Sequence, residues 1–482
     1  MHAKKGKKLQ SLTAMSSALL TLSLAVTACG GSNGSGEASP SASASSSAAA
    51  SPSASASASP SASASASESA APAEKVKIDF WTQKFEDTTD AWFKKYVDAY
   101  NKSQSNVEIK LTIVPGDAWD QKMKAAQAAG KAPEIRTISY GNIANAAKTG
   151  QILPLDDLMA PAVFDDLYDN VKEFVNVGGK YYAYPKLVEP SSVMFYRKDL
   201  FEAAGLDPEK PPTTWAELLE DAKALTKKGV FGLSIAQNAP DLGWSSWGLQ
   251  YNAAGHLALT DDWSKADINN DGYKALYKFY QDAYQSGAMP KQQLAPYADI
   301  KGFGEGKVAI QICGSWAIGQ LRNSYKNLID KVGIAPMASI DGDQTKPTAT
   351  LGGWTLAVDG KAGHPQQAAD FISYLLAGDP QIMIDFFKSA QFSKFSPRKS
   401  VDEAMKTDPD ASKDTWRALI AEKIIPYAKA EPLYPWDVAL AVSTGIESAM
   451  KGTSVDKAIA KAEKDVNDFI AKNKLAGTNP RA

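Results

Sequence analysis

Residues 76–114 read VKIDFWTQKFEDTTDAWFKKYVDAYNKSQSNVEIKLTIV, and the spacing of their apolar side chains changes twice. The first six residues alternate as in a strand, residues 90–100 carry large apolar side chains at helical spacing, and residues 107–114 alternate again. An Ala-rich helix over 117–129 and a strand over 134–139 are expected next. Strands that alternate with helices in this way predict an α/β fold with a mostly parallel sheet.

The same alternation continues along the rest of the chain. About 400 residues follow position 75, more than one ordinary α/β domain holds, so two lobes are expected. Thr213 or Thr214 is the expected N-cap of a helix over 214–228. The other expected strands cover 181–185, 192–196, 230–235, 308–312, 332–334 and 354–358; the other expected helices cover 273–285 and 366–376, and the chain after residue 400 is expected to be mainly helical.

The first 29 residues have the pattern of an export signal. Lysines at the start precede an apolar run from about Leu12 to Val26, which is too short for a lasting transmembrane helix. Val26-Thr27-Ala28-Cys29 resembles a lipobox, so we expect residues 1–28 to be removed and Cys29 to carry a diacylglycerol anchor. A plain signal peptide with a chance cysteine is the alternative, which is disfavoured because the chain has only 2 cysteines. The other, Cys313, is expected to be a buried apolar residue.

A segment of Ser, Ala and Pro separates this signal from the folded region. Residues 37–73 contain almost nothing else, and such a composition has too little apolar surface to fold. Residues 29–74 are therefore expected to form a disordered tether that holds the protein at a cell membrane, on the extracellular or periplasmic side. Glycosylation of the serines stays open.

Composition excludes several function classes. Basic and acidic residues number 52 and 54 with no basic stripe, which disfavours a nucleic-acid partner. The 3 histidines are isolated, which disfavours a zinc site and His-based hydrolysis, and no metal or other cofactor is expected. Residues 267–272 fit half of a calcium loop, but Lys278 replaces its bidentate Glu, so a helix N-cap before Tyr273 is favoured.

Several short motifs stand in an order that resembles one known family. They are Phe80-Trp81, Gly150-Gln-Ile-Leu-Pro-Leu-Asp156, Gly179-Lys-Tyr-Tyr-Ala-Tyr-Pro185, Met194-Phe-Tyr-Arg-Lys-Asp-Leu-Phe-Glu-Ala-Ala-Gly205, Pro211-Pro-Thr-Thr-Trp-Ala-Glu-Leu218, Phe303-Gly-Glu-Gly-Lys-Val-Ala309, Gly314-Ser-Trp316, Leu351-Gly-Gly-Trp354, Pro435-Trp436 and Gly452-Thr-Ser-Val-Asp-Lys-Ala458. Over about 75–470 the chain is similar to the extracellular solute-binding proteins of ABC transporters that bind carbohydrates, the family that includes maltodextrin-binding protein.

The resemblance implies a two-lobed periplasmic-binding-protein fold of type II, a hinge, and a ligand held between the lobes. The N-terminal lobe is expected to comprise 75–188 and 336–394, and the C-terminal lobe 189–335 and 395–482. Hinge crossings are expected near 185–191, 333–350 and 390–397. The implied partners are a sugar or oligosaccharide, the permease subunits of an ABC importer and, through Cys29, the membrane, with the protein itself a monomer.

Sugar recognition requires flat aromatic rings for the apolar ring faces and polar groups for the hydroxyls. Tryptophans at strand ends or in Gly/Pro/Ser-rich loops are the expected stacking residues, and polar residues near them or matching family positions are the expected hydroxyl partners. The stacking candidates are Trp81, Trp244, Trp316, Trp354 and Trp436; the polar candidates are Gln83, Glu86, Tyr140, Asn142, Glu189, Asp241, Arg398 and Asp437.

Two other function classes remain open at this stage. Paired carboxylates could serve a glycan-active enzyme, but no motif assembles an acid with a nucleophile, so no catalytic residue is assigned. A binder of peptides, polyamines or another small polar solute with the same fold is the second alternative, and a peptide or polyamine would favour acidic side chains over stacked aromatic rings. The tryptophans in the loops therefore disfavour a peptide or polyamine ligand.

Overall fold

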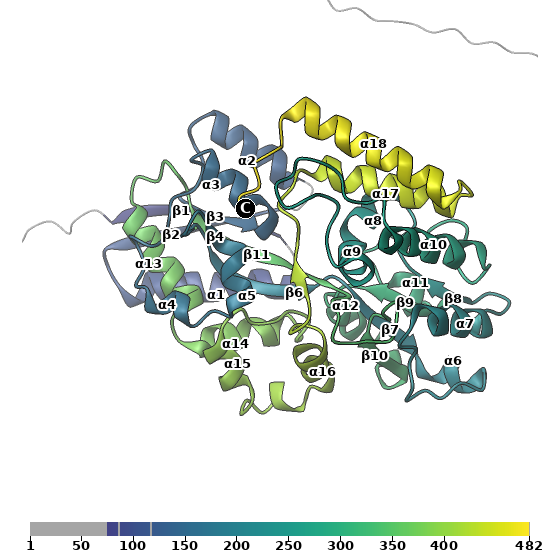
Figure 1. Cartoon of the computed structure of the whole chain (residues 1–482). Coiled ribbons are helices and arrows are strands. Elements are labelled where there is room, and N and C mark those ends of the chain that lie inside the picture. Colours follow the sequence, from purple (N-terminus) through teal and green to yellow (C-terminus); the bar gives the residue numbers. More distant parts are fainter. Residues whose placement is uncertain (1–74, 85–86, 116–117, 482) are drawn as a thin grey trace, which may run out of the picture. The chain divides into compact units, whose positions relative to one another are not determined.

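The computed structural model describes residues 75–84, 87–115 and 118–481, which belong to one compact unit of the chain (Figure 1). Cys29, the Ser/Ala/Pro segment and Glu86 lie outside the described residues. Two main sheets flanked by helices confirm the predicted α/β class. No helix in the described part combines the length and the apolar content needed to cross a membrane.

The first sheet has the strand order β12-β11-β3-β1-β2, and β6 also pairs with β11. β1 runs parallel to β2 and β3, whereas β11 runs antiparallel to β3 and β6. The carboxyl ends of β1, β3 and β6 therefore point to the same edge of the sheet. Its strands are β1 (Val76–Gln83), β2 (Val107–Val114), β3 (Ile135–Ser139), β6 (Tyr184–Pro190), β11 (Thr350–Val358) and β12 (Lys429–Ala430).

The second sheet has the order β10-β7-β9-β8, with β7 antiparallel to both of its neighbours and β8 parallel to β9. A two-stranded hairpin, β4 with β5, stands apart from both sheets. The strands are β7 (Val193–Arg197), β8 (Phe231–Ser234), β9 (Val308–Cys313) and β10 (Val332–Pro336), and in the hairpin β4 (Asn176–Val177) and β5 (Lys180–Tyr181).

Helices fill most of the chain between the strands, and the chain after residue 400 is mainly helical, as predicted. Up to β9 they are α1 (Asp87–Ser103), α2 (Trp119–Ala128), α3 (Tyr140–Lys148), α4 (Ala162–Asp165), α5 (Asp169–Val175), α6 (Lys198–Ala203), α7 (Trp215–Leu225), α8 (Ala239–Ser245), α9 (Trp247–Ala254), α10 (Asp271–Gln285) and α11 (Lys301–Gly304). After β9 they are α12 (Ala317–Ser324), α13 (Pro365–Ile372), α14 (Pro380–Ser389), α15 (Lys399–Met405), α16 (Thr415–Lys423), α17 (Trp436–Met450) and α18 (Val455–Asn473), with short segments of other helix types at η2 (Lys326–Lys331), η3 (Ser373–Ala377) and η4 (Ala411–Lys413).

Two helix starts follow directly from local chemistry. Thr214 Oγ1 accepts from the Glu217 backbone N–H at 3.1 Å, and Glu217 Oε2 accepts from the Thr214 N–H at 3.0 Å, which completes a capping box before α7. Asn270 Oδ1 accepts from the Tyr273 N–H at 3.0 Å and caps α10. The predicted N-cap before Tyr273 is thus confirmed.

Each sheet has its own apolar core, and a third apolar cluster joins them. Helices α17 and α18, last in the chain, pack with the second sheet through residues such as Val442 and Ile459. Val401 and Met405 of α15 belong to the apolar cluster of the first sheet. The predicted lobe boundaries stay a prediction.

Cys313 belongs to the cluster that contains residues of both sheets and is fully buried. Among the described residues it is a free cysteine, and burial raises the pKa of its thiol to about 12. The expectation of a buried apolar residue is confirmed.

Candidate ligand-binding site

A cavity of about 770 Å³ opens at the carboxyl ends of strands from both sheets. Gln83 ends β1, Ser139 ends β3, and Glu189 lies near the end of β6. From the second sheet, Trp244 lies on α8, which follows β8, and Trp316 lies just after β9. This is the edge at which open α/β sheets hold their ligands, and the volume suits a small molecule.

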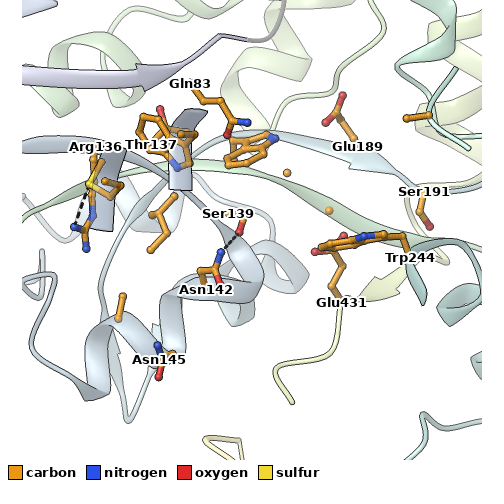
Figure 2. A pocket seen from close by; sticks show the side chains of 18 of the residues that line it. Gln83, Arg136, Thr137, Ser139, Asn142, Asn145, Glu189, Ser191, Trp244 and Glu431 are labelled. Carbon is orange, nitrogen blue, oxygen red and sulfur yellow. Dashed lines mark hydrogen bonds between the residues drawn. The ribbon is translucent and has the colours of Figure 1, made fainter. Parts of the chain in front are cut away.

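The cavity gathers part of the predicted set. Figure 2 shows Glu189, Ser191, Trp244 and Glu431 around one part of the cavity, and Arg136 and Asn145 in another. The predicted residues that line the cavity are Gln83, Asn142, Glu189, Asp241, Trp244, Trp316 and Trp354.

Trp81 and Tyr140 do not line the cavity. Trp81 packs with Val114 and Met123, and the Lys122 ammonium lies 4.6 Å from the centroid of its ring. Tyr140 is buried, and its hydroxyl donates to the Leu187 carbonyl at 3.0 Å. Both side chains support the wall of the cavity from behind.

Arg398 lies outside the cavity lining, in a buried hydrogen-bond network. Its Nε donates to Asp166 Oδ2 at 2.7 Å, and its terminal nitrogens donate to the carbonyls of Leu376 and Gly378, each at 2.9 Å. Asp166 also accepts from the Ser400 hydroxyl at 2.6 Å. The guanidinium is held by structural partners and does not line the cavity.

Trp436 supports a cavity residue instead of lining the cavity itself. Its ring stacks on that of Trp244, and a Cβ on Gly243 would lie 2.5 Å from the Trp436 indole, so glycine at 243 permits the close approach. Asp437 is in the first turn of α17 and is exposed, away from the cavity lining.

Trp316 is half-buried beside the cavity and is held in one orientation. Its Nε1 donates to the Ala298 carbonyl at 3.1 Å, and its ring meets Tyr297 edge to face with centroids 5.8 Å apart. Trp244 is 49% exposed, which is unusual for a side chain of its size. These two indoles therefore present apolar surface to an incoming ligand.

Asp241 lines the cavity, but its carboxylate is already engaged. Oδ2 accepts from Asn238 Nδ2 at 2.9 Å, Gln293 Nε2 at 2.5 Å and the Tyr297 N–H at 3.1 Å. These bonds join α8 to the loop that carries Pro296 and Tyr297. Asp241 therefore shapes the cavity wall by positioning this loop.

Gln83 supplies a polar group that lacks a partner. Its Oε1 is buried and accepts no hydrogen bond within the described part of the protein. A buried acceptor without a donor costs about 1–3 kcal/mol. Since Gln83 also lines the cavity, a donor from a bound ligand would remove this cost.

A family profile described as bacterial extracellular solute-binding protein matches residues 86–382. The chain belongs to this family. The mannitol-binding protein of Pseudomonas aeruginosa is 28% identical to this solute-binding protein over 293 residues, which cover 57% of this chain and 63% of that protein. The sn-glycerol-3-phosphate-binding periplasmic protein UgpB of Yersinia pestis is 27% identical over 341 residues, covering 66% of this chain and 73% of that protein.

A solved structure with the same fold is that of the cyclic α-maltosyl-1,6-maltose binding protein of Arthrobacter globiformis. It aligns with a TM-score of 0.69 at 27% identity and covers 83% of this chain and 100% of that chain. The resemblance to extracellular solute-binding proteins is thereby confirmed, and so is the two-lobed α/β fold.

Sequence reasoning missed many cavity residues of this solute-binding protein, and two examples show why. Helix α2 contributes Trp119, Met123 and Gln127, whose i, i+4 spacing places them on one helix face and was the available signal. Glu431 follows the two-residue strand β12, too short to leave an alternation in the sequence. No pattern pointed to it.

Proposed function

We propose that this protein captures an uncharged polyhydroxy solute, namely a sugar, oligosaccharide or polyol, and delivers it to an ABC importer. The proposal rests on one observation. Trp244, Trp316 and Gln83 line the same cavity, and Gln83 Oε1 is a buried acceptor that has no donor among the described residues. Indole faces bury the apolar C–H surface of such a ligand, and its hydroxyls supply the missing donor. The mannitol and cyclic α-maltosyl-1,6-maltose named for two of the similar proteins belong to this class, whereas the sn-glycerol 3-phosphate named for UgpB is anionic.

Calorimetric titration after a thermal-shift screen tests this proposal. The panel consists of D-mannitol, maltose, cyclic α-maltosyl-1,6-maltose, sn-glycerol 3-phosphate and spermidine. We expect an uncharged member to raise the melting temperature and to bind with a stoichiometry near one, because a ligand that binds only the folded state stabilises it. Stabilisation by spermidine alone would favour the polyamine alternative.

We further propose that the protein binds its ligand without chemical change. Glu189 is held by Lys394 and Asp241 by three donors, which leaves neither free to act as a nucleophile. The bound oligosaccharide should be recovered intact by chromatography after prolonged incubation. Stoichiometric binding followed by appearance of shorter products would overturn this part.

The anchor at Cys29 is a separate proposal, supported by the lipobox-like sequence Val26-Thr27-Ala28-Cys29. Replacing Cys29 with Ser should release the protein from the membrane fraction into the surrounding fluid. Replacement of Ser32, three residues further on, with Ala is the matched control and should leave it at the membrane. Equal membrane retention of both variants would contradict lipidation.

A further inference from the structure

Glu431 lies against the backbone of β11. A Cβ built on Gly352 would lie 2.4 Å from Glu431 Oε1, so the carboxyl group occupies the space that the glycine leaves beside the strand. Gly352 and Glu431 both line the cavity, and Figure 2 shows the Glu431 side chain in the part of the cavity that holds Trp244. The carboxyl group is therefore placed where a ligand would be.

The groups that face Glu431 do not stabilise a negative charge. Among the described residues it has no hydrogen-bond partner and no ion-pair partner. Glu189 on β6 is itself acidic, and its Oε1 is bound to Lys394 Nζ at 2.9 Å. The Tyr140 hydroxyl on α3 donates its hydrogen bond to the Leu187 carbonyl and not to Glu431. Lys186, on the same strand as Glu189, points elsewhere: its ammonium lies over the rings of Phe93 and Phe386, and burial lowers its pKa to about 7.

An ionised Glu431 would thus be a partly buried charge, without a partner among the described residues, beside a second carboxylate. Such a charge is costly unless it is paired, and a proton removes the cost. Burial, and then the charge of Glu189, raise the pKa of Glu431 to about 8. At neutral pH the group is accordingly a carboxylic acid, with one O–H donor and free acceptor positions.

We propose that Glu431 is a specificity-determining residue that meets the ligand as an uncharged acid, donating to and accepting from a hydroxyl group, and that it thereby disfavours cationic ligands. This inference rests on the proposed function and narrows its ligand class. A hydroxyl has both a donor and acceptors and matches the acid, whereas an ammonium group has donors alone and requires the carboxylate. Capture of a neutral ligand must then weaken in alkaline solution.

The test is the pH dependence of the dissociation constant of the uncharged probe that binds, among D-mannitol, maltose and cyclic α-maltosyl-1,6-maltose. If the ionised form does not bind, the dissociation constant rises about tenfold between pH 7 and pH 9. Glu431→Gln keeps an uncharged donor and acceptor, so it should bind with nearly wild-type affinity at pH 7 and lose the alkaline weakening. Lys186 titrates in the same range, but comparison of wild type with Glu431→Gln cancels its contribution.

Glu422→Gln, an exposed substitution outside the cavity lining, is the matched control and should behave as wild type. The inference fails if wild-type affinity is constant or increases from pH 7 to pH 9. If spermidine binds and no uncharged probe binds at any pH, both the inference and the proposed function are wrong. A ligand-free readout is the infrared difference spectrum between wild type and Glu431→Gln at pH 6.5, where absence of a protonated-carboxyl band would also overturn the inference.

Discussion

The indole ring of Trp244 stacks on that of Trp436, with centroids 4.7 Å apart and an interplanar angle of 28°. Trp247 meets both rings edge to face, at 5.2 Å from Trp244 and 6.3 Å from Trp436. The outer face of Trp244 is exposed at the cavity, while its inner face rests on a ring that does not line it. Trp244 therefore lines the cavity, and Trp436 supports it from behind.

Replacing Trp244 with Ala should weaken ligand binding by about 2 kcal/mol, because a central aromatic contact is lost. Trp436→Ala should weaken it less, since Trp244 remains but loses the ring that orients it. Trp436→Phe should restore most of the affinity. Titration calorimetry measures all three. Tyr427→Ala, an exposed aromatic residue outside the cavity lining, is the control; equal affinity of Trp244→Ala and wild type would remove Trp244 from the site.

Replacing only one partner of the Glu189–Lys394 ion pair should lower the stability of the folded protein. Their side chains are only 12% and 6% exposed, so Glu189→Gln removes the carboxylate from a buried ammonium. A loss of about 3 kcal/mol in the free energy of unfolding is expected, measurable by urea denaturation. The double variant Glu189→Gln with Lys394→Met should recover part of it. A purely additive double variant would contradict the coupling.

Arg398 should affect stability and leave ligand affinity unchanged. Arg398→Lys cannot reproduce the contacts of the guanidinium to Asp166, Leu376 and Gly378, so we expect a loss of about 2 kcal/mol in stability. The dissociation constant of the bound probe should match that of wild type at a temperature where both are folded. A change of tenfold or more would return Arg398 to the binding site.

Glu431 should also leave a signature in the stability of the ligand-free protein. Folding raises its pKa from 4.5 to about 8, so the unfolded chain releases this proton first. Stability associated with Glu431 is therefore fully present below about pH 4.5 and is lost as the pH rises to about 8. Glu431→Gln should raise the melting temperature by about 2 °C or more at pH 8.5, with little difference near pH 4. A pH-independent difference would contradict the shifted pKa.

The sequence predicted the elements better than the site. β2 begins and ends where its alternation predicts, and the alternating Val107 and Ile109 are buried in the core of the first sheet. The same alternation places Trp81 and Gln83 on one face of β1, yet only Gln83 reaches the cavity. Trp81 is two residues from the strand end, about 6.6 Å further back, where it packs with residues of α2.

Side-chain roles depend on partners that are distant in the sequence, and these could not be predicted. Arg398 and Asp166 are separated by 232 positions, and Asp241 and Gln293 by 52. No local pattern indicates that these polar groups satisfy one another. The position of the Glu431 carboxyl group likewise depends on a distant residue, because it occupies the space beside Gly352 that a side chain there would fill.

Ser191 and Thr350 stand where the chain passes between the two sheets, and they are bonded to each other three times. The Ser191 N–H donates to the Thr350 carbonyl at 2.9 Å, the Thr350 N–H donates to Ser191 Oγ at 3.0 Å, and the two hydroxyl oxygens lie 3.0 Å apart. Because these hydrogen bonds join the two segments, a bend in one requires a matching bend in the other. Rotation at either of these two crossings is thereby coupled to rotation at the other.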